Sequence, residues 1–109
     1  MPKMLITAND NDIAPRFDAC LEVVILDAPA GKTPSEAKTL VLAEPSAEEI
    51  CRIVLAENAL IVLCGGIDED HYQYLRWKRV EVFDGLIGPW EAMVQRYAAG
   101  ILQPCDIVR

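Results

Sequence analysis

The sequence predicts an α/β domain with a five-stranded mixed sheet and helices on both of its faces. The first observation is an apolar run over residues 59–64 that leads directly into Gly65-Gly66. Because hydrophobic and polar residues do not alternate in this run, we expect a strand buried on both faces, which requires helices above and below it. The second observation is the order of elements, in which strand-like segments come first and then alternate with segments of helical spacing.

Length and composition are those of one domain. The chain has 109 residues, of which 52% are hydrophobic, and this is enough for a single core. We expect one domain over residues 1–109, with its core over about residues 4–102 and a short C-terminal tail. No apolar run is long enough for a signal peptide or a membrane span, so we expect a cytoplasmic protein.

Charge and cysteine spacing argue against several functions. The formal net charge is −7 and no basic run is present, which argues against binding to nucleic acid or to an anionic membrane. The four cysteines are Cys20, Cys51, Cys64 and Cys105, and no two of them form a CxxC pair. We therefore expect separately buried, reduced thiols rather than a disulfide framework or a zinc ribbon.

The first three strands are predicted over residues 4–8, 21–27 and 38–42. The first ends in a run of Asn and Asp residues that favours a turn, and this run lacks the glycine and the distant glutamate of a calcium-binding EF-hand loop. Pro15 keeps the next segment extended, and Phe17 is its expected core residue. The connection over residues 28–35 suits an antiparallel hairpin.

Three helices are predicted in the second half of the chain. Ser46 followed by Glu49 forms a capping box, and in the helix behind it we interpret Cys51 as a small buried hydrophobe. Asp68 is the expected N-cap of a second helix that ends near residue 79. Pro89 is expected at the first position of a third helix, with Gly100 at its C-terminal end. The apolar stripe of that helix comprises Trp90, Met93, Val94, Tyr97 and Ile101.

A last strand over residues 80–83 completes the order β-β-β-α-β-α-β-α. A meander followed by right-handed crossovers then gives the five-stranded mixed sheet. In open α/β sheets, ligands bind beyond the carboxyl ends of the strands. The turn through Gly65-Gly66 is therefore the expected position of a binding site.

Four strings stand in a characteristic order along the chain. They are Ile13-Ala14-Pro15-Arg16-Phe17, Ile61-Val62-Leu63-Cys64-Gly65-Gly66-Ile67, Val80-Glu81-Val82-Phe83 and Tyr97-Ala98-Ala99-Gly100. Together they resemble the dinitrogenase iron–molybdenum cofactor biosynthesis family, which includes NifX-like proteins and the C-terminal part of NifB-like proteins. The likeness extends over about residues 4–102. Many members have His before the Phe and Gly after it, where this chain has Arg16 and Asp18, so an imidazole ligand is absent from that loop.

This resemblance implies a ribonuclease-H-like fold and a nitrogenase accessory factor, a small protein of metallocofactor biosynthesis. Such a protein binds or carries an iron–sulfur cluster or a molybdenum-containing cluster, such as the iron–molybdenum cofactor, and is not an enzyme. Its expected partners are the proteins that donate and accept the cluster, and its expected state is a monomer or a weak homo-oligomer. Members of the family also occur outside nitrogen fixation, so the resemblance does not establish a nitrogenase role.

The candidate cluster site joins the loop over residues 9–20 with the turn over residues 64–71. Its expected contact residues are Asn9, Asp10, Arg16, Cys64, Gly65 and Gly66. Its expected metal ligands are Cys64, His71 and Cys20. Thiolate and imidazole both suit iron, a thiol near a helix N-terminus can have a lowered pKa, and glycine amides can bind an anion.

Each of these residues also has a simpler interpretation. Cys64 is either a ligand or an inert thiol in an apolar strand, and His71 is either a ligand or an ordinary helix residue. Gly65-Gly66 is either an anion site or only a tight turn. For Arg76, Lys78 and Arg79 we prefer a solvated helix face, whereas Tyr72, Tyr74 and Trp77 cannot all face the sheet. One or two of these aromatic rings should therefore be exposed and form a partner surface.

Two other functions compete with cluster carriage. A ligand-free interaction module would need no site at all. A metal-dependent nuclease would need an acidic group such as Asp10, Glu22 and Asp68 or Asp70 to hold magnesium. The nuclease is the weaker alternative, because the chain has no basic run to hold nucleic acid.

Overall fold

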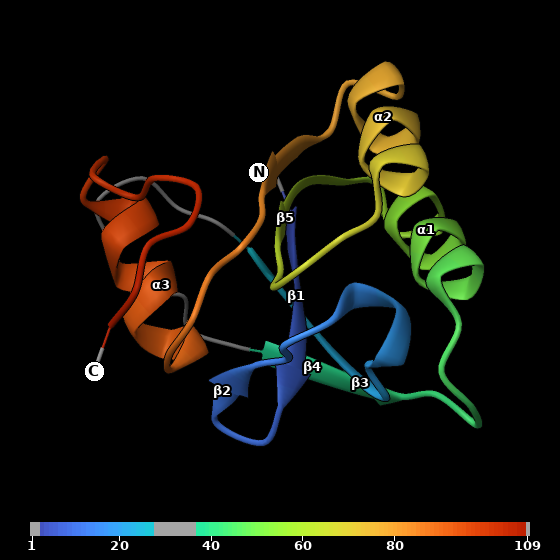
Figure 1. The fold of residues 1–109 in the computed structure, drawn as a ribbon, viewed down its shortest axis with the longest axis horizontal. Helices are drawn as coiled ribbons and strands as arrows, with labels where there is room; N and C mark the ends of the chain where they lie inside the picture. The colour runs from blue at the N-terminus through green and yellow to red at the C-terminus, as the bar shows by residue number, and fades with distance from the viewer. Residues whose placement is uncertain (1–2, 28–36, 109) are drawn as a thin grey trace.

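A mixed sheet forms the centre of the molecule, with its main strands in the order β4-β3-β1-β5-β6 (Figure 1). The computed structural model describes residues 3–27 and 37–108, so the predicted loop over residues 28–35 lies outside the described residues. The main strands are β1 (Lys3–Asn9), β3 (Glu22–Asp27), β4 (Ala37–Val41), β5 (Ala59–Leu63) and β6 (Glu81–Phe83). The central strand β1 runs antiparallel to β3 and parallel to β5, which makes the sheet mixed as predicted.

The predicted count of five strands was one too few. A two-residue strand, β2 (Asp12–Ile13), pairs antiparallel with the end of β1. Asp10 turns the chain between the two strands with a φ of 56°, a left-handed conformation that Asp tolerates. The polar run therefore forms a turn, as expected, but the turn closes a hairpin too short to be recognised from alternation of residue types.

Three helices cover both faces of the sheet, as predicted. Helices α1 (Ala47–Ala56) and α2 (Glu69–Trp77) lie together on one face, and α3 (Trp90–Ala98) lies on the opposite face (Figure 1). The core is accordingly divided into two clusters. One contains Phe17 and the buried face of α1, and the other contains Met93 and Val94 of α3.

The helix starts follow the predicted capping residues, with one exception. Ser46 Oγ accepts a hydrogen bond from Glu49 N, and the Asp68 carboxylate accepts one from His71 N. Pro89, expected inside the third helix, is instead its N-cap with an extended backbone. Gly100 follows the end of α3 with a φ of 77°, as a C-terminal glycine should.

Two apolar residues expected in the core are exposed. Leu60 is 51% exposed because the register between β1 and β5 shifts at this point, so that it lies unpaired between the partners of Lys3 and Met4. Ile101 is 60% exposed because α3 ends at Ala98 and the chain turns away at Gly100. No helix in residues 3–27 and 37–108 is long and apolar enough to cross a membrane.

Candidate functional site

The two predicted site loops lie side by side. Arg16 forms an isolated parallel bridge with Gly66, in which Phe17 N donates to Gly66 O and Gly66 N donates to Pro15 O, both at 2.8 Å. The Gly66 amide is thus used by the protein itself, which contradicts its predicted role in binding an anion. A Cβ on Gly65 would lie 2.3 Å from Ala14 O, so Gly65 is required for the close approach of the two loops.

The two cysteines predicted as ligands here are buried. Cys64 has no exposed surface, and its pKa is raised strongly, first by burial and then by the nearby Asp84 and Cys20. Cys20 is 3% exposed, its Sγ donates to Glu22 O at 2.8 Å, and burial raises its pKa. The expected lowering of a thiol pKa is therefore not found, and both residues fit the inert interpretation.

The polar residues of the first loop bind within the loop and its neighbours. Arg16 forms a bidentate pair with Asp18, with Nη2 2.9 Å from Oδ2 and Nε 3.1 Å from Oδ1. These are the two positions at which the sequence departs from the family pattern, and here they neutralise each other. Asn9 is exposed at the end of β1, and Asp10 O accepts a hydrogen bond from Trp90 Nε1 at 3.1 Å.

His71 is the predicted ligand that reaches an open surface. Its Nδ1 lies 2.6 Å from Asp68 Oδ1, while its backbone N donates to Asp68 Oδ2 at 3.1 Å. The hydrogen bond to His71 is the main cause that lowers the pKa of Asp68. An ionised Asp68 holds the proton of a neutral imidazole on Nδ1, which leaves the Nε2 lone pair available as a metal ligand or proton acceptor.

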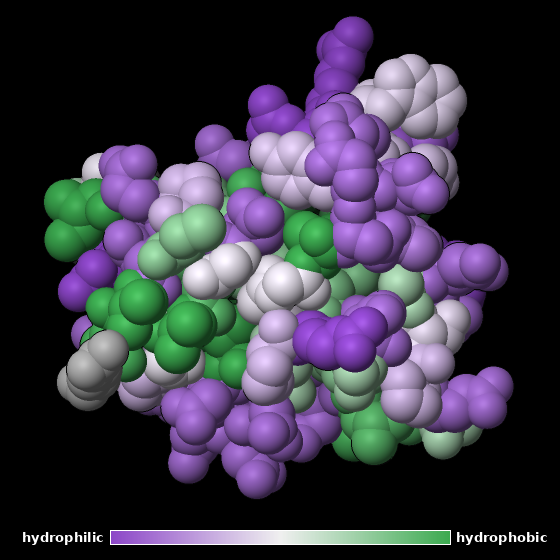
Figure 2. Space-filling view, viewed as in Figure 1, coloured by the Kyte–Doolittle hydropathy of each residue, from purple (hydrophilic) through white to green (hydrophobic). Residues whose placement is uncertain are grey.

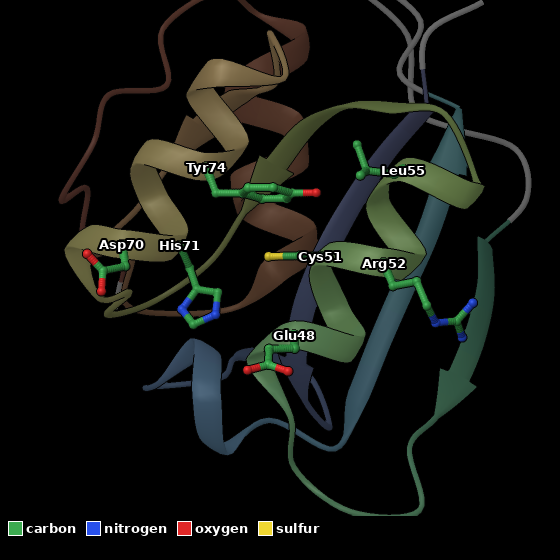
Figure 3. Close-up of a pocket in the computed structure, with 7 residues that line it drawn as sticks. All are labelled: Glu48, Cys51, Arg52, Leu55, Asp70, His71 and Tyr74. Carbon is green, nitrogen blue, oxygen red and sulfur yellow. The ribbon is translucent and has the colours of Figure 1, made fainter.

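This histidine lines a cleft of about 460 Å³ between α1 and α2 (Figure 3). The lining residues are Glu48, Cys51, Arg52, Leu55, Asp70, His71 and Tyr74. Figure 3 shows the Cys51 sulfur pointing from α1 toward α2, the His71 and Tyr74 rings reaching from α2 toward α1, and Glu48 at the start of α1. Arg52 and Asp70 are turned outward. The cleft therefore combines a thiol, an imidazole and a phenol with a carboxylate at the start of α1.

Sequence reasoning missed Cys51 as a site residue. The residue is 5% exposed, as its interpretation as a buried hydrophobe implies, but it also lines the cleft. Burial raises its pKa to about 11, and the negative charges of Asp68 and Glu48 contribute to this shift, so the thiol is neutral at pH 7. The helical spacing of Glu48, Cys51, Arg52 and Leu55 was a usable signal, because it places all four on one side of α1.

The described residues contain no preformed metal cage. In residues 3–27 and 37–108, no three side chains of the types His, Cys, Asp and Glu are grouped so that they could hold a metal ion. The predicted ligand set of Cys64, His71 and Cys20 is therefore not assembled, and neither is an acidic group of the kind that a magnesium nuclease requires. The α1–α2 cleft is lined by one sulfur donor, Cys51, and one imidazole donor, His71, together with the carboxylates of Glu48 and Asp70.

Comparison with known proteins gives matches in structure only. No family model matches the sequence, and no curated protein matches it. The protein PH0822 shares the fold with a TM-score of 0.82 and 17% identity, covering 94% of this chain and 93% of its own. A "putative dinitrogenase" from Methanococcus jannaschii has a TM-score of 0.76 and 18% identity, with 94% and 92% covered. A "putative NifB protein" from Thermotoga has a TM-score of 0.71 and 14% identity, with 100% and 98% covered.

The resemblance is confirmed for the fold. The order of strands and helices continues over almost the full length of these neighbours, so the whole single α/β domain is shared. Identities of 14–18% support no transfer of function, because one fold hosts many functions. The residues of the α1–α2 cleft therefore have to be argued from this chain alone.

Asp68→Ala is expected to lower the free energy of unfolding by about 1 kcal/mol, because α2 loses its N-cap acceptor. Asp68→Asn keeps a capping acceptor but loses the carboxylate that binds His71 Nδ1, so its cost should be smaller. Urea unfolding measures both values.

The hydrogen bond between Asp68 and His71 should also make the free energy of unfolding depend on pH. A carboxyl whose pKa is lowered on folding stabilises the protein above its unfolded pKa, and this contribution is lost as the pH falls through the lowered folded value. The free energies of unfolding of the parent protein and of Asp68→Asn should therefore differ most near neutral pH and become more similar in acid. A difference in free energy of unfolding that grows in acid would contradict the hydrogen bond between the Asp68 carboxylate and His71.

Proposed function

We propose that this protein binds and carries a preassembled iron–sulfur or molybdenum-containing cluster, as an accessory factor of metallocofactor assembly and not as an enzyme. The observation that carries the proposal is His71, whose Nδ1 is held by Asp68 beside Cys51 in an open cleft. The neighbours named for dinitrogenase and NifB support the metallocofactor context. The ribonuclease-H-like class and a cytoplasmic location belong to the same proposal.

The donor set favours a cluster over a bare metal ion. A bare zinc or iron ion generally takes three or four protein ligands, whereas the cleft offers one thiol and one imidazole as its soft or borderline donors. A preassembled cluster brings most of its own sulfur ligands, so two protein ligands are enough to hold it. A carrier must also release its cargo, and few protein ligands make release easier.

The position of Cys51 adds a condition on loading. The cleft is open, but the thiol is 5% exposed, so α1 and α2 must separate slightly when the cluster binds.

Cluster retention by single-residue variants tests the proposal. Protein purified without oxygen is incubated with a preassembled iron–sulfur cluster, or with thiomolybdate, and then desalted before metal content and visible absorption are measured. Cys51→Ser and His71→Gln should each weaken retention by more than about tenfold, since each removes one of two ligands. Cys64→Ala and Cys105→Ser are matched cysteine controls and should retain the cluster like the parent.

Two outcomes would contradict this assignment. Loss of the cluster in Cys64→Ala alone would return the site to the turn after β5. A parent protein that stays colourless and takes up nothing would favour the ligand-free interaction module.

Loading should also depend on pH. Because the pKa of Cys51 is about 11, the thiol must lose a proton when it becomes a ligand, and binding releases that proton. Cluster affinity should therefore rise as the pH increases toward about 11. In Cys51→Ser this rise should be largely lost, whereas an unchanged rise would show that another group releases the proton. Titrations of the protein with the cluster at several pH values measure how the affinity changes with pH.

A further inference from the structure

The positive charges of this acidic protein are unequally neutralised. Eight Lys and Arg residues lie in the described ranges 3–27 and 37–108. Five of these form ion pairs with carboxylates, namely Lys3, Arg16, Lys38, Arg52 and Arg96. The three that make no ion pair with any other described residue are Arg76, Lys78 and Arg79. All three are exposed and lie together at the C-terminal end of α2.

An exposed tryptophan lies among them. Trp77 is 74% exposed, although a tryptophan normally buries most of its large apolar surface. Lys78 Nζ lies 4.5 Å from the Trp77 ring centre and 5.7 Å from that of Tyr74, and the two rings are 6.4 Å apart. Figure 2 shows strongly hydrophilic side chains gathered around α2, with paler ones between them. We call Tyr74, Arg76, Trp77, Lys78 and Arg79 the basic–aromatic surface.

We propose that the basic–aromatic surface docks an acidic segment of another protein. Arg and Trp are the residues that most often dominate binding energy at protein interfaces, and unpaired cations attract carboxylates. The dipole of α2 favours cations near its end, but it does not require an exposed Trp77 beside them. Tyr74 also lines the α1–α2 cleft, so the docked segment lies next to the cleft mouth.

The charge distribution favours a short acidic peptide over a polyanion. Against a formal net charge of −7, three cations form only a local positive patch. A nucleic acid or an anionic membrane would extend beyond this patch and meet the acidic remainder of the surface. An acidic segment with apolar side chains can match both the cations and the Trp77 ring.

Nitrogen-15 NMR of the full unloaded chain tests this docking surface. The probes are short synthetic peptides in which Glu alternates with Leu or Phe, the same peptides with Lys in place of Glu, a single-stranded DNA oligonucleotide and phosphatidylserine vesicles. The Glu peptides should move the Trp77 indole signal and the α2 amide signals, with an affinity that falls as salt rises. Trp77→Phe identifies the indole signal.

Charge-reversed variants provide the matched comparison. Lys78→Glu should weaken binding of the Glu peptides by at least about tenfold. Lys38→Glu changes the net charge by the same amount, but Lys38 lies on β4. The affinity of this variant for the Glu peptides should therefore stay within about twofold of that of the parent.

Three results would overturn the proposal: Glu peptides that leave Trp77 and α2 unmoved, equal binding of the Lys peptides, or tighter binding of the DNA or the vesicles. Docking is measured on unloaded protein, so its failure is distinct from a failure of cluster binding. His71→Gln should dock the peptides like the parent.

Discussion

Gly65→Ala is expected to destabilise the protein by about 3 kcal/mol or more, at or beyond the upper end of overpacking effects. A Cβ at this position would lie 2.3 Å from Ala14 O and 2.6 Å from Pro15 O. Both obstacles are backbone atoms, and the segment that carries them is tied to Gly66 by two hydrogen bonds of 2.8 Å. The loop therefore cannot move aside without losing these bonds. Urea unfolding measures the loss.

Gly66→Ala is the matched control for this prediction. Its Cβ would meet Pro15 O at 3.4 Å, which is close to ordinary van der Waals contact. We expect a change of less than about 1 kcal/mol in either direction. A Gly65→Ala protein as stable as Gly66→Ala would show that the two loops do not approach as closely as described.

Phe17→Ala is expected to cost about 3–5 kcal/mol, the usual range for removing a buried aromatic ring. Phe17 has no exposed surface and belongs to the core cluster beneath α1 and α2. Its ring centre also lies 6.3 Å from that of His71, so the cavity would open under the candidate ligand. Cluster retention should therefore fall together with stability.

Phe17→Leu separates these effects. It keeps an apolar side chain in the core, so we expect a smaller loss of about 1–2 kcal/mol and a folded protein in which cluster retention can be measured. Denaturant unfolding gives the two free energies. Near-equal stability of Phe17→Ala and the parent would contradict the burial described for this ring.

Most of the fold could be predicted because each element carries its own local signal. The apolar run before Gly65 indicated the buried strand, and Ser46 and Asp68 marked two helix starts through hydrogen bonds that the structure contains. The structure differs from the prediction where contacts with a neighbouring element determine the exposure of a residue. Leu60 is exposed by a register shift against β1, which no pattern within its own strand could reveal.

The site was harder to predict because its residues come from different elements. Cys51 and His71 lie on separate helices, and only the packing of α1 beside α2 places both on one cleft. Cys64 was favoured because it follows the apolar strand, yet it has no exposed surface and belongs to the core cluster beneath α1 and α2. Sequence position at a strand end indicates where a site can form, but side-chain burial decides which residues are available.

The most direct test of the cluster-carrier account uses the single histidine of the chain. Selective nitrogen-15 labelling of histidine labels only His71. The protein is loaded with the cluster, brought to a paramagnetic state and measured by pulsed electron paramagnetic resonance. The account predicts a nitrogen-15 hyperfine coupling from one directly bound imidazole nitrogen, which is absent in His71→Gln. A loaded cluster with no coupling to the labelled histidine would contradict the assignment of the α1–α2 cleft.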